Sequence, residues 1–267
     1  MFYTVLLGGQ LTWNIPLVVG LICIAVLYSF IVKRDTRIPL TRLQPLLFFL
    51  GLVLLYLATG SPLSTISHLS FSLHMIQMSL LYFIVPPFIL LGIPEPIFKQ
   101  IYKLPMIKKG SKRLLRPKTA LYIFATLFLM YHLPFALDIL SQNAFIQNGY
   151  LFLLFLLSFS IWWPITSPDL KQRLHGKQMK RYVFRSGLLL MPACVFFMLT
   201  ALTDGMNNPF LTQITSQLCI PSGNGSLQLL PPPFNTEYDQ LMAGIFMLGI
   251  HKFGIMLSLR LGNKMQG

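Results

Sequence analysis

The chain has 267 residues, of which 54% are hydrophobic and only 10% are charged, whereas a soluble domain carries about a quarter charged residues. Its mean hydropathy is +0.65 and its formal net charge is +14. Such a charge can indicate nucleic-acid binding, but here the basic residues lie in short loops between apolar runs. The composition therefore excludes an ordinary soluble domain, argues against a nucleic-acid partner, and predicts an integral membrane protein whose basic loops meet anionic lipid headgroups.

Basic residues are confined to alternate connections between the apolar runs. The 21 Lys and Arg residues fall into four groups: four at 33–42, eight at 95–118, six at 167–185, and Lys252, Arg260 and Lys264 near the C-terminus. The remaining connections contain neither residue type: 1–15, 61–69, 141–148 and 203–239. Because Lys and Arg are retained on the cytoplasmic side of membranes, this pattern predicts an outside N-terminus and a cytoplasmic C-terminus.

Seven apolar segments are long enough to approach the ~20 residues that a spanning helix needs. They are residues 16–32, 43–60, 71–93, 119–140, 150–165, 183–202 and 240–261. They predict an all-α, multi-pass protein of the plasma membrane: a single polytopic domain over 1–267 built as a seven-helix bundle. Because no basic stretch or cleavage site precedes the first run, we expect an uncleaved span. The Pro-rich outer loop 203–239 is either a connector or a cap over the outer face.

The third predicted span contains a group of polar and sulfur-bearing residues, which are candidates for function because polar groups at membrane depth are costly. His74 and Met78 are four residues apart and share one helix face near the outer boundary, with Gln77 beside it and His68 just before the span. Imidazole and thioether groups suit Cu(I), but a site needs further ligands from other helices. Alternatively, His74 forms a hydrogen bond between helices and Met78 fills the core.

The fourth predicted span carries His132 in its outer half and Asp138 near the outer rim. His132 is a candidate second ligand that faces His74. A structural role is equally open, because Pro134 leaves the carbonyl of Met130 without its helical donor and His132 could bond in that neighbourhood.

The seventh predicted span begins at an acidic cluster and continues to a second His and Met pair. Asp239, with Glu237 and Asp204, would form an acidic outer mouth that attracts a cation, or it is an ordinary solvated loop. Met247 and His251 are four residues apart and lie deeper in the membrane.

Other chemistry finds little support in the sequence. Of the three cysteines, Cys23 and Cys194 fall inside predicted spans, where we expect them to pack in the bundle, and Cys219 lies in the outer loop. No CxxC pair, Walker loop, GxSxG or HExxH motif is present, and the spans contain no paired carboxylates or nucleophile and base. We therefore do not expect an enzyme.

Taken together, several motifs resemble the CtaG-type cytochrome c oxidase assembly factors, a polytopic membrane family. The motifs are His74-Met75-Ile76-Gln77-Met78, Pro86-Pro87 with Gly92 and Pro94, Tyr131-His132-Leu133-Pro134 before Asp138, Trp162-Trp163-Pro164, and Asp239-Gln240 with Gly244. The resemblance runs from roughly residue 10 to residue 260. Many relatives have His at position 78 and further His residues near 147–151, so this chain resembles a His-poor, Gram-positive-like branch.

This resemblance implies an assembly factor for a haem–copper oxidase that helps copper, as Cu(I), to be delivered or inserted from the outer side. It carries His74, Met75, Met78 and His132 over as candidate metal ligands. The implied partners are cytochrome c oxidase subunits, and an extracytoplasmic copper chaperone is a candidate partner. Two alternatives stay open: a transporter for copper or another small solute, and an assembly scaffold that binds no metal. The Trp162-Trp163 pair is expected in an interfacial aromatic belt.

Overall fold

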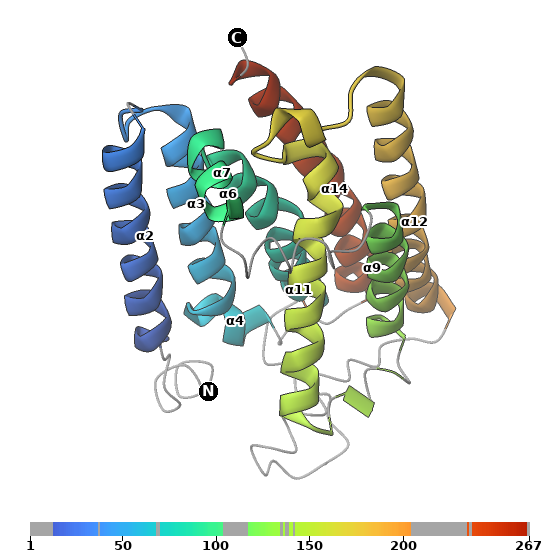
Figure 1. Cartoon of the computed structure of the whole chain (residues 1–267). Coiled ribbons are helices and arrows are strands. Elements are labelled where there is room, and N and C mark those ends of the chain that lie inside the picture. The colour runs from blue at the N-terminus through green and yellow to red at the C-terminus, as the bar shows by residue number, and fades with distance from the viewer. Residues whose placement is uncertain are drawn as a thin grey trace.

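The computed structural model describes residues 13–36, 38–67, 70–103, 117–133, 136, 139–140, 142–203, 234 and 237–265, and all regular structure within them is helical (Figure 1). The predicted all-α class is thus confirmed for the described residues. The first half contains α2 (Ile15–Asp35), α3 (Leu43–Thr59), α4 (Pro62–Ser67), α5 (Phe71–Ser79), the π-helix η1 (Leu80–Ile84), α6 (Val85–Gly92) and α7 (Glu95–Lys103). The second half contains α9 (Pro117–Tyr131), α11 (Ala144–Thr166), the 3-10 helix η2 (Leu170–Gln172), α12 (Gly176–Thr203) and α14 (Glu237–Lys264).

Among the described residues, four helices are long and apolar enough to cross a membrane. They are Ile15–Asp35, Phe71–Gly92, Phe145–Thr166 and Glu237–Lys264, and Leu43–Thr59 is a shorter apolar helix. Each of the seven predicted segments falls in helix for all or part of its length. The count of seven spans and the orientation of the termini remain predictions.

The fourth predicted segment is not one continuous helix, although residues 136, 139 and 140 are again helical. Helix α9 ends at Tyr131, and a turn and a bend follow at His132 and Leu133. Pro134 explains this end, because a proline disfavours the helical conformation of the preceding residue and offers no N–H to the helix. His132 therefore lies at the end of a helix instead of within one.

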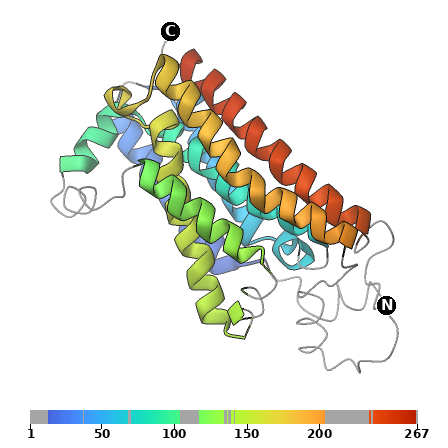
Figure 2. The same cartoon turned by 90° about the vertical axis from the view of Figure 1, so that its right-hand side faces the viewer.

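The stretch α5–η1–α6 is the centre of the bundle, whereas α2 lies at its edge (Figure 1). In an apolar stretch of 18 residues from each helix, 78% of the residues are buried in Phe71–Gly92, against 17% in Ile15–Asp35. The central stretch packs against α3, α11 and α14. Figure 2 shows α12 and α14 side by side along their length, in agreement with their contacts. Cys23 on α2 is exposed, which corrects the expectation that it packs in the bundle, while Cys194 is buried as expected.

The third predicted span is broken at mid-depth by its two prolines. Pro86 and Pro87 have no N–H, so the carbonyls of Tyr82 and Phe83 lose their usual helical donors, and η1 forms with Val85 N donating to Leu80 O. Because no water is available in the hydrocarbon, such carbonyls need other partners. The indole Nε1 of Trp162 donates to the carbonyl of Tyr82 at 2.9 Å. Trp162 is therefore buried inside the bundle, with 2% exposure, and its place at the membrane interface stays a prediction.

The carbonyl of Phe83 is approached by a second helix at a glycine. A Cβ at Gly254 of α14 would lie 2.6 Å from this carbonyl oxygen, closer than real Cβ atoms come. Only glycine therefore lets the backbone of α14 pack against the broken helix here.

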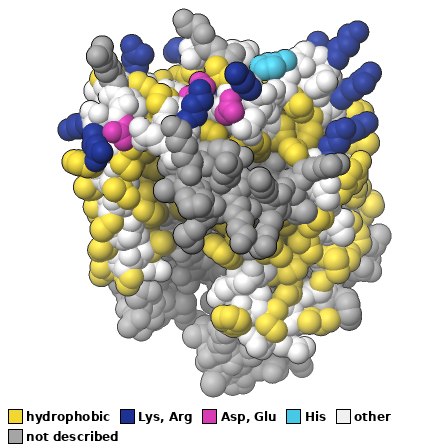
Figure 3. Space-filling model, in the orientation of Figure 1, with side chains coloured by type: hydrophobic (Ala, Val, Ile, Leu, Met, Phe, Trp, Pro, Cys, Tyr) yellow, Lys and Arg dark blue, Asp and Glu magenta, His cyan; other side chains and the backbone are white. Residues whose placement is uncertain are grey.

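The charged side chains are concentrated at one end of the molecule. In Figure 3, Lys and Arg gather at the end where the C-terminus lies, and hydrophobic side chains are prominent on the described surface below them. This distribution matches a membrane protein with one strongly basic boundary.

Candidate functional site

The structure brings His132 and Met75 together. The Nδ1 atom of His132 lies 2.6 Å from the carbonyl oxygen of Phe128, and its Nε2 atom lies 3.3 Å from the sulfur of Met75. Because a carbonyl only accepts, Nδ1 carries the proton. In the neutral ring, Nε2 then presents a lone pair to a thioether sulfur, which has no proton to share. Two electron-pair donors thus face each other in the core, with His132 6% and Met75 3% exposed.

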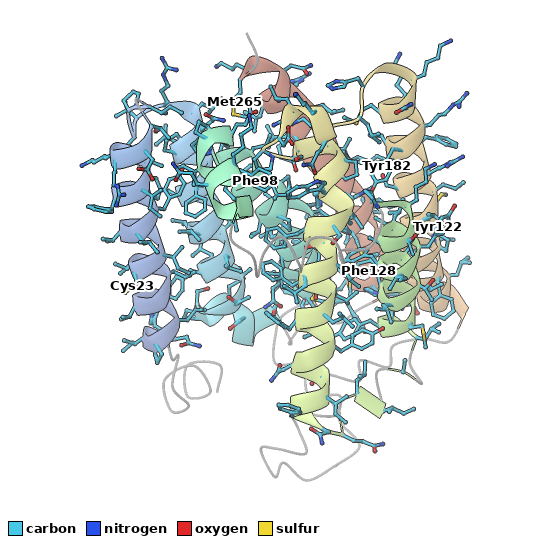
Figure 4. The ribbon with its side chains drawn as sticks, viewed as in Figure 1. Cys23, Phe98, Tyr122, Phe128, Tyr182 and Met265 are labelled. Atoms are coloured by element: carbon cyan, nitrogen blue, oxygen red, sulfur yellow. The ribbon has the colours of Figure 1, made fainter. Side chains whose placement is uncertain are left out.

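Local sequence explains how His132 reaches this position. The ring of Phe128 is fully buried and stacks on Phe124, with 5.4 Å between the ring centroids, and Figure 4 shows Phe128 on the inner side of α9. One turn later the helix ends, so His132 can fold its Nδ1 back to the carbonyl of Phe128. The opposite edge of the imidazole ring therefore points across to α5.

His74 and Met78 are also buried in the core. The ring of His74 lies beside Tyr131, with 6.3 Å between the ring centroids, and Met78 belongs to the same hydrophobic cluster as Met75. We predicted that His132 faces His74; the contact found for His132 is with Met75, the neighbour of His74, and its role as a metal ligand stays a prediction. Among the described residues, no group of three or more His, Cys, Asp or Glu side chains could hold a metal ion.

Gln77 fastens α5 to the elements before it. Its amide Nε2 donates to the carbonyl of Ala58 near the end of α3 at 2.6 Å, and its Oε1 accepts from the hydroxyl of Ser67 in α4 at 2.6 Å. This is a positioning role for a residue that the sequence singled out. His68, the residue after Ser67, lies outside the described residues.

Asp239 at the start of α14 is bound to the N-terminus of α5. Its carboxylate accepts hydrogen bonds from the backbone amides of Phe71 at 2.9 Å and Ser72 at 3.3 Å. The hydroxyl of Ser70 donates to both carboxylate oxygens at 3.0 Å, and that of Ser72 donates to Oδ1. With only 3% exposure, this carboxylate is not part of an exposed acidic mouth. Glu237 is exposed, and Asp204 lies outside the described residues.

Met247 and His251, four residues apart on α14, are both buried. Met247 belongs to the same buried hydrophobic cluster as Met75 and Met78. The ring of His251 packs edge-on against Phe83 of the π-helix, with 4.8 Å between the ring centroids. His251 follows Asp239 by twelve residues, which is about 18 Å along a helix axis, so it lies well below the start of α14. Asp138, the other candidate near the outer rim, and Cys219 lie outside the described residues.

Ser70 and Ser72 were missed from the sequence, although one signal was available. A Ser directly before an apolar run is a typical helix start, and Ser70 caps α5 by accepting from Leu73 N at 3.3 Å. The partner of these serines, Asp239, is 169 residues away from Ser70, and no local pattern points to it.

Comparison with known protein families confirms the family resemblance that the sequence motifs indicated. A family model described as cytochrome c oxidase caa3 assembly factor matches residues 26–260, which is most of the chain. Comparison with curated proteins and with solved structures gave no match. The match includes both His132 and the whole of α5.

Proposed function

Because the chain belongs to the cytochrome c oxidase caa3 assembly factor family, we propose that it assists oxidase assembly by holding Cu(I) for delivery to oxidase subunits. The observation that carries the proposal is the 3.3 Å contact between Nε2 of His132 and the sulfur of Met75. Copper is cargo in this proposal. The role is one of binding and transfer and needs no catalytic residue.

The donor chemistry fits Cu(I) better than a hard cation. Thioether sulfur is a soft ligand and selects Cu(I), imidazole nitrogen is a general ligand for late transition metals, and Mg²⁺ or Ca²⁺ would require oxygen donors. His132 and Met75 would bind the ion, and His74 and Met78 are the next candidates because they share this part of the core. A site with few thioether ligands releases Cu(I) readily to an acceptor with similar ligands.

The proposed topology places this site on the outer side of the plasma membrane. We infer seven spans with the N-terminus outside, because Lys and Arg are absent from alternate connections and basic loops remain cytoplasmic. In that orientation His132 lies in the outer half and the basic end meets anionic headgroups. Enzymatic reporter fusions after residues 67, 142 and 265 test this: the first two should report the outside and the third the cytoplasm.

The decisive experiment compares oxidase purified from cells with and without this protein. We expect a lowered copper-to-haem ratio in its absence, restored by the intact chain but not by His132→Ala or Met75→Leu. Met256→Leu, at an exposed position on α14, is the matched control for Met75→Leu and should restore the ratio. A normal copper content in oxidase from the deletion strain would contradict copper delivery, and reduced assembly with normal copper content would favour the metal-free scaffold.

One observation supports a transporter as the second candidate. His251 lies deep in the bundle, and its buried Nδ1 has no hydrogen-bond partner among the described residues, as expected for a group that binds a passing solute. Uptake of copper into proteoliposomes, lost in His251→Ala, would support this candidate over the assembly factor that only holds copper.

A further inference from the structure

The carboxylate of Asp239 is buried between the N-termini of two helices. It belongs to the first turn of α14 and accepts hydrogen bonds from two amides in the first turn of α5. Each helix N-terminus is equivalent to roughly half a positive charge. Together the two ends roughly offset the single negative charge, which accounts for a buried carboxylate only while both helices keep this arrangement.

This carboxylate also organises the rest of the first turn of α5. A helix start leaves four N–H groups without partners in the helix, and Asp239 binds two of them, those of Phe71 and Ser72. Of the other two, that of Leu73 donates to the hydroxyl of Ser70, and that of Ser70 donates to the carbonyl of Ser67. Since the hydroxyl of Ser70 donates to Asp239, the carboxylate orients the residue that caps the amide of Leu73.

The first turn of α5 determines where Met75 lies. Met75 follows Phe71 by four residues, so the two share one face of the helix. A helix turns by roughly 100° and rises ~1.5 Å per residue. A slip of one residue at the start of α5 would therefore turn the thioether of Met75 away from Nε2 of His132.

Asp239 joins α5 to the part of the bundle that holds His132, whereas Gln77 joins it to α3 and α4. Helix α14 packs along α12, and α12 packs on α9, whose end carries His132. The packing of α14 on α12 is close near Asp239, because a Cβ at Gly244 would lie 3.1 Å from the carbonyl of Cys194. A continuous chain of contacts thus runs from Asp239 through α14 and α12 to α9.

We propose that Asp239 is a positioning residue that holds α5 in the register at which Met75 meets His132. It acts through the amides and hydroxyls at the start of α5. The consequence for copper rests on the proposed function, whereas the consequence for the position of Met75 does not.

The copper-independent test is a methyl NMR spectrum of the full chain with labelled methionines. The methyl signal of Met75, assigned with Met75→Leu, should be displaced by the ring current of His132. In Asp239→Asn the amide NH₂ would face other donors, and we expect the Met75 signal to move toward its position in His132→Ala. Glu237→Gln makes the same chemical change at an exposed position two residues earlier and should leave it unmoved. An unchanged Met75 signal in folded Asp239→Asn would overturn the proposal.

The second measurement is Cu(I) affinity by competition with a chelator, together with the X-ray absorption of the bound copper. Asp239→Asn should lower the affinity by about tenfold or more and reduce the sulfur contribution, while Glu237→Gln matches the natural chain. If the natural chain binds no Cu(I), the proposed function fails, and the methyl spectrum still decides the role of Asp239. A displaced Met75 signal with unchanged affinity would support positioning and remove Met75 from the ligands.

Two milder variants apply if Asp239→Asn does not fold. Ser72→Ala removes one hydroxyl donor and keeps both backbone amides, so it should move the Met75 signal in the same direction by a smaller amount. Asp239→Glu keeps the charge and should fold with a partly displaced signal. Signals identical to the natural chain in both variants would overturn the proposal.

Discussion

The two halves of the broken central helix are held in different ways. The predicted topology makes α5 the outer half and α6 the inner half. The outer half is fastened by side-chain hydrogen bonds: Asp239 binds its first turn and Gln77 binds it to α3 and α4. The inner half, α6, is fastened mainly by shape. There Gly92 meets the backbone of Phe48, where a Cβ would lie 2.6 Å from the amide nitrogen.

This difference separates the part that carries the candidate site from the part that supports it. Hydrogen bonds from side chains hold α5 in one register, and a change of a single proton or charge can alter them. Close backbone packing at α6, in contrast, leaves no room for the helix to shift. We expect changes in the inner half to lower stability without a selective effect on copper, and changes in the outer half to affect copper more than stability. The following four predictions test that contrast, from the largest expected effect to the smallest.

Gly92→Ala should be the most destabilising change. The new methyl group would meet the backbone of Phe48, which cannot move like a side chain, and overpacking costs about 3 kcal/mol or more in such a case. Thermal unfolding in detergent measures the effect. Gly249→Ala is the matched control, because nothing lies within 4 Å of a Cβ there. Equal melting temperatures for the two variants would contradict the packing of α6 against α3.

Trp162→Phe should destabilise the chain by about 2 kcal/mol, because the buried carbonyl of Tyr82 loses its donor. Trp163→Phe is the control, since its indole donates to Gln172 in an exposed environment. We expect Cu(I) affinity to stay unchanged in both variants once they are folded. A selective loss of Cu(I) affinity in Trp162→Phe would contradict the conclusion that the two halves have separate roles.

Gln77→Leu should cost about 1 kcal/mol of stability through two lost hydrogen bonds, but it should lower Cu(I) affinity. The reason is that α5 would lose its connection to α3 and α4, so Met75 would be less well placed. Gln240→Leu on α14 is unsuitable as a control because it is buried, whereas Gln178→Leu on the exposed part of α12 is suitable. If Gln77→Leu binds Cu(I) with unchanged affinity, Asp239 alone would be responsible for the position of Met75.

Tyr28→Phe should have the smallest effect, about 1 kcal/mol. Its hydroxyl donates to the carbonyl of Gly92 at 2.6 Å, but its ring would keep its stacking on Phe48 at 3.9 Å between centroids. Chemical denaturation compares it with Tyr122→Phe, whose ring is exposed on α9. A larger loss than that of Gly92→Ala would show that hydrogen bonding, and not shape, holds the inner half.

Local patterns predicted the helical segments and most candidate residues, but not how these residues are used. His132 and Met75 were both singled out, yet their contact depends on α9 ending at Tyr131, which follows from Pro134. The roles of Asp239 and Trp162 depend on partners that are 169 and 80 residues away, beyond the reach of periodicity. Cys23 was expected inside the bundle because lipid and core are equally apolar, so hydropathy alone cannot tell them apart.

The break in the central helix has a consequence for how relatives of this chain should vary. Pro86 and Pro87 leave two carbonyls without their helical donors: Trp162 donates to that of Tyr82, and Gly254 lets α14 pack close to that of Phe83. In a relative with ordinary residues at 86 and 87, neither the indole nor the glycine would be required. The residues at these four positions, which lie on three helices, should therefore vary together among relatives.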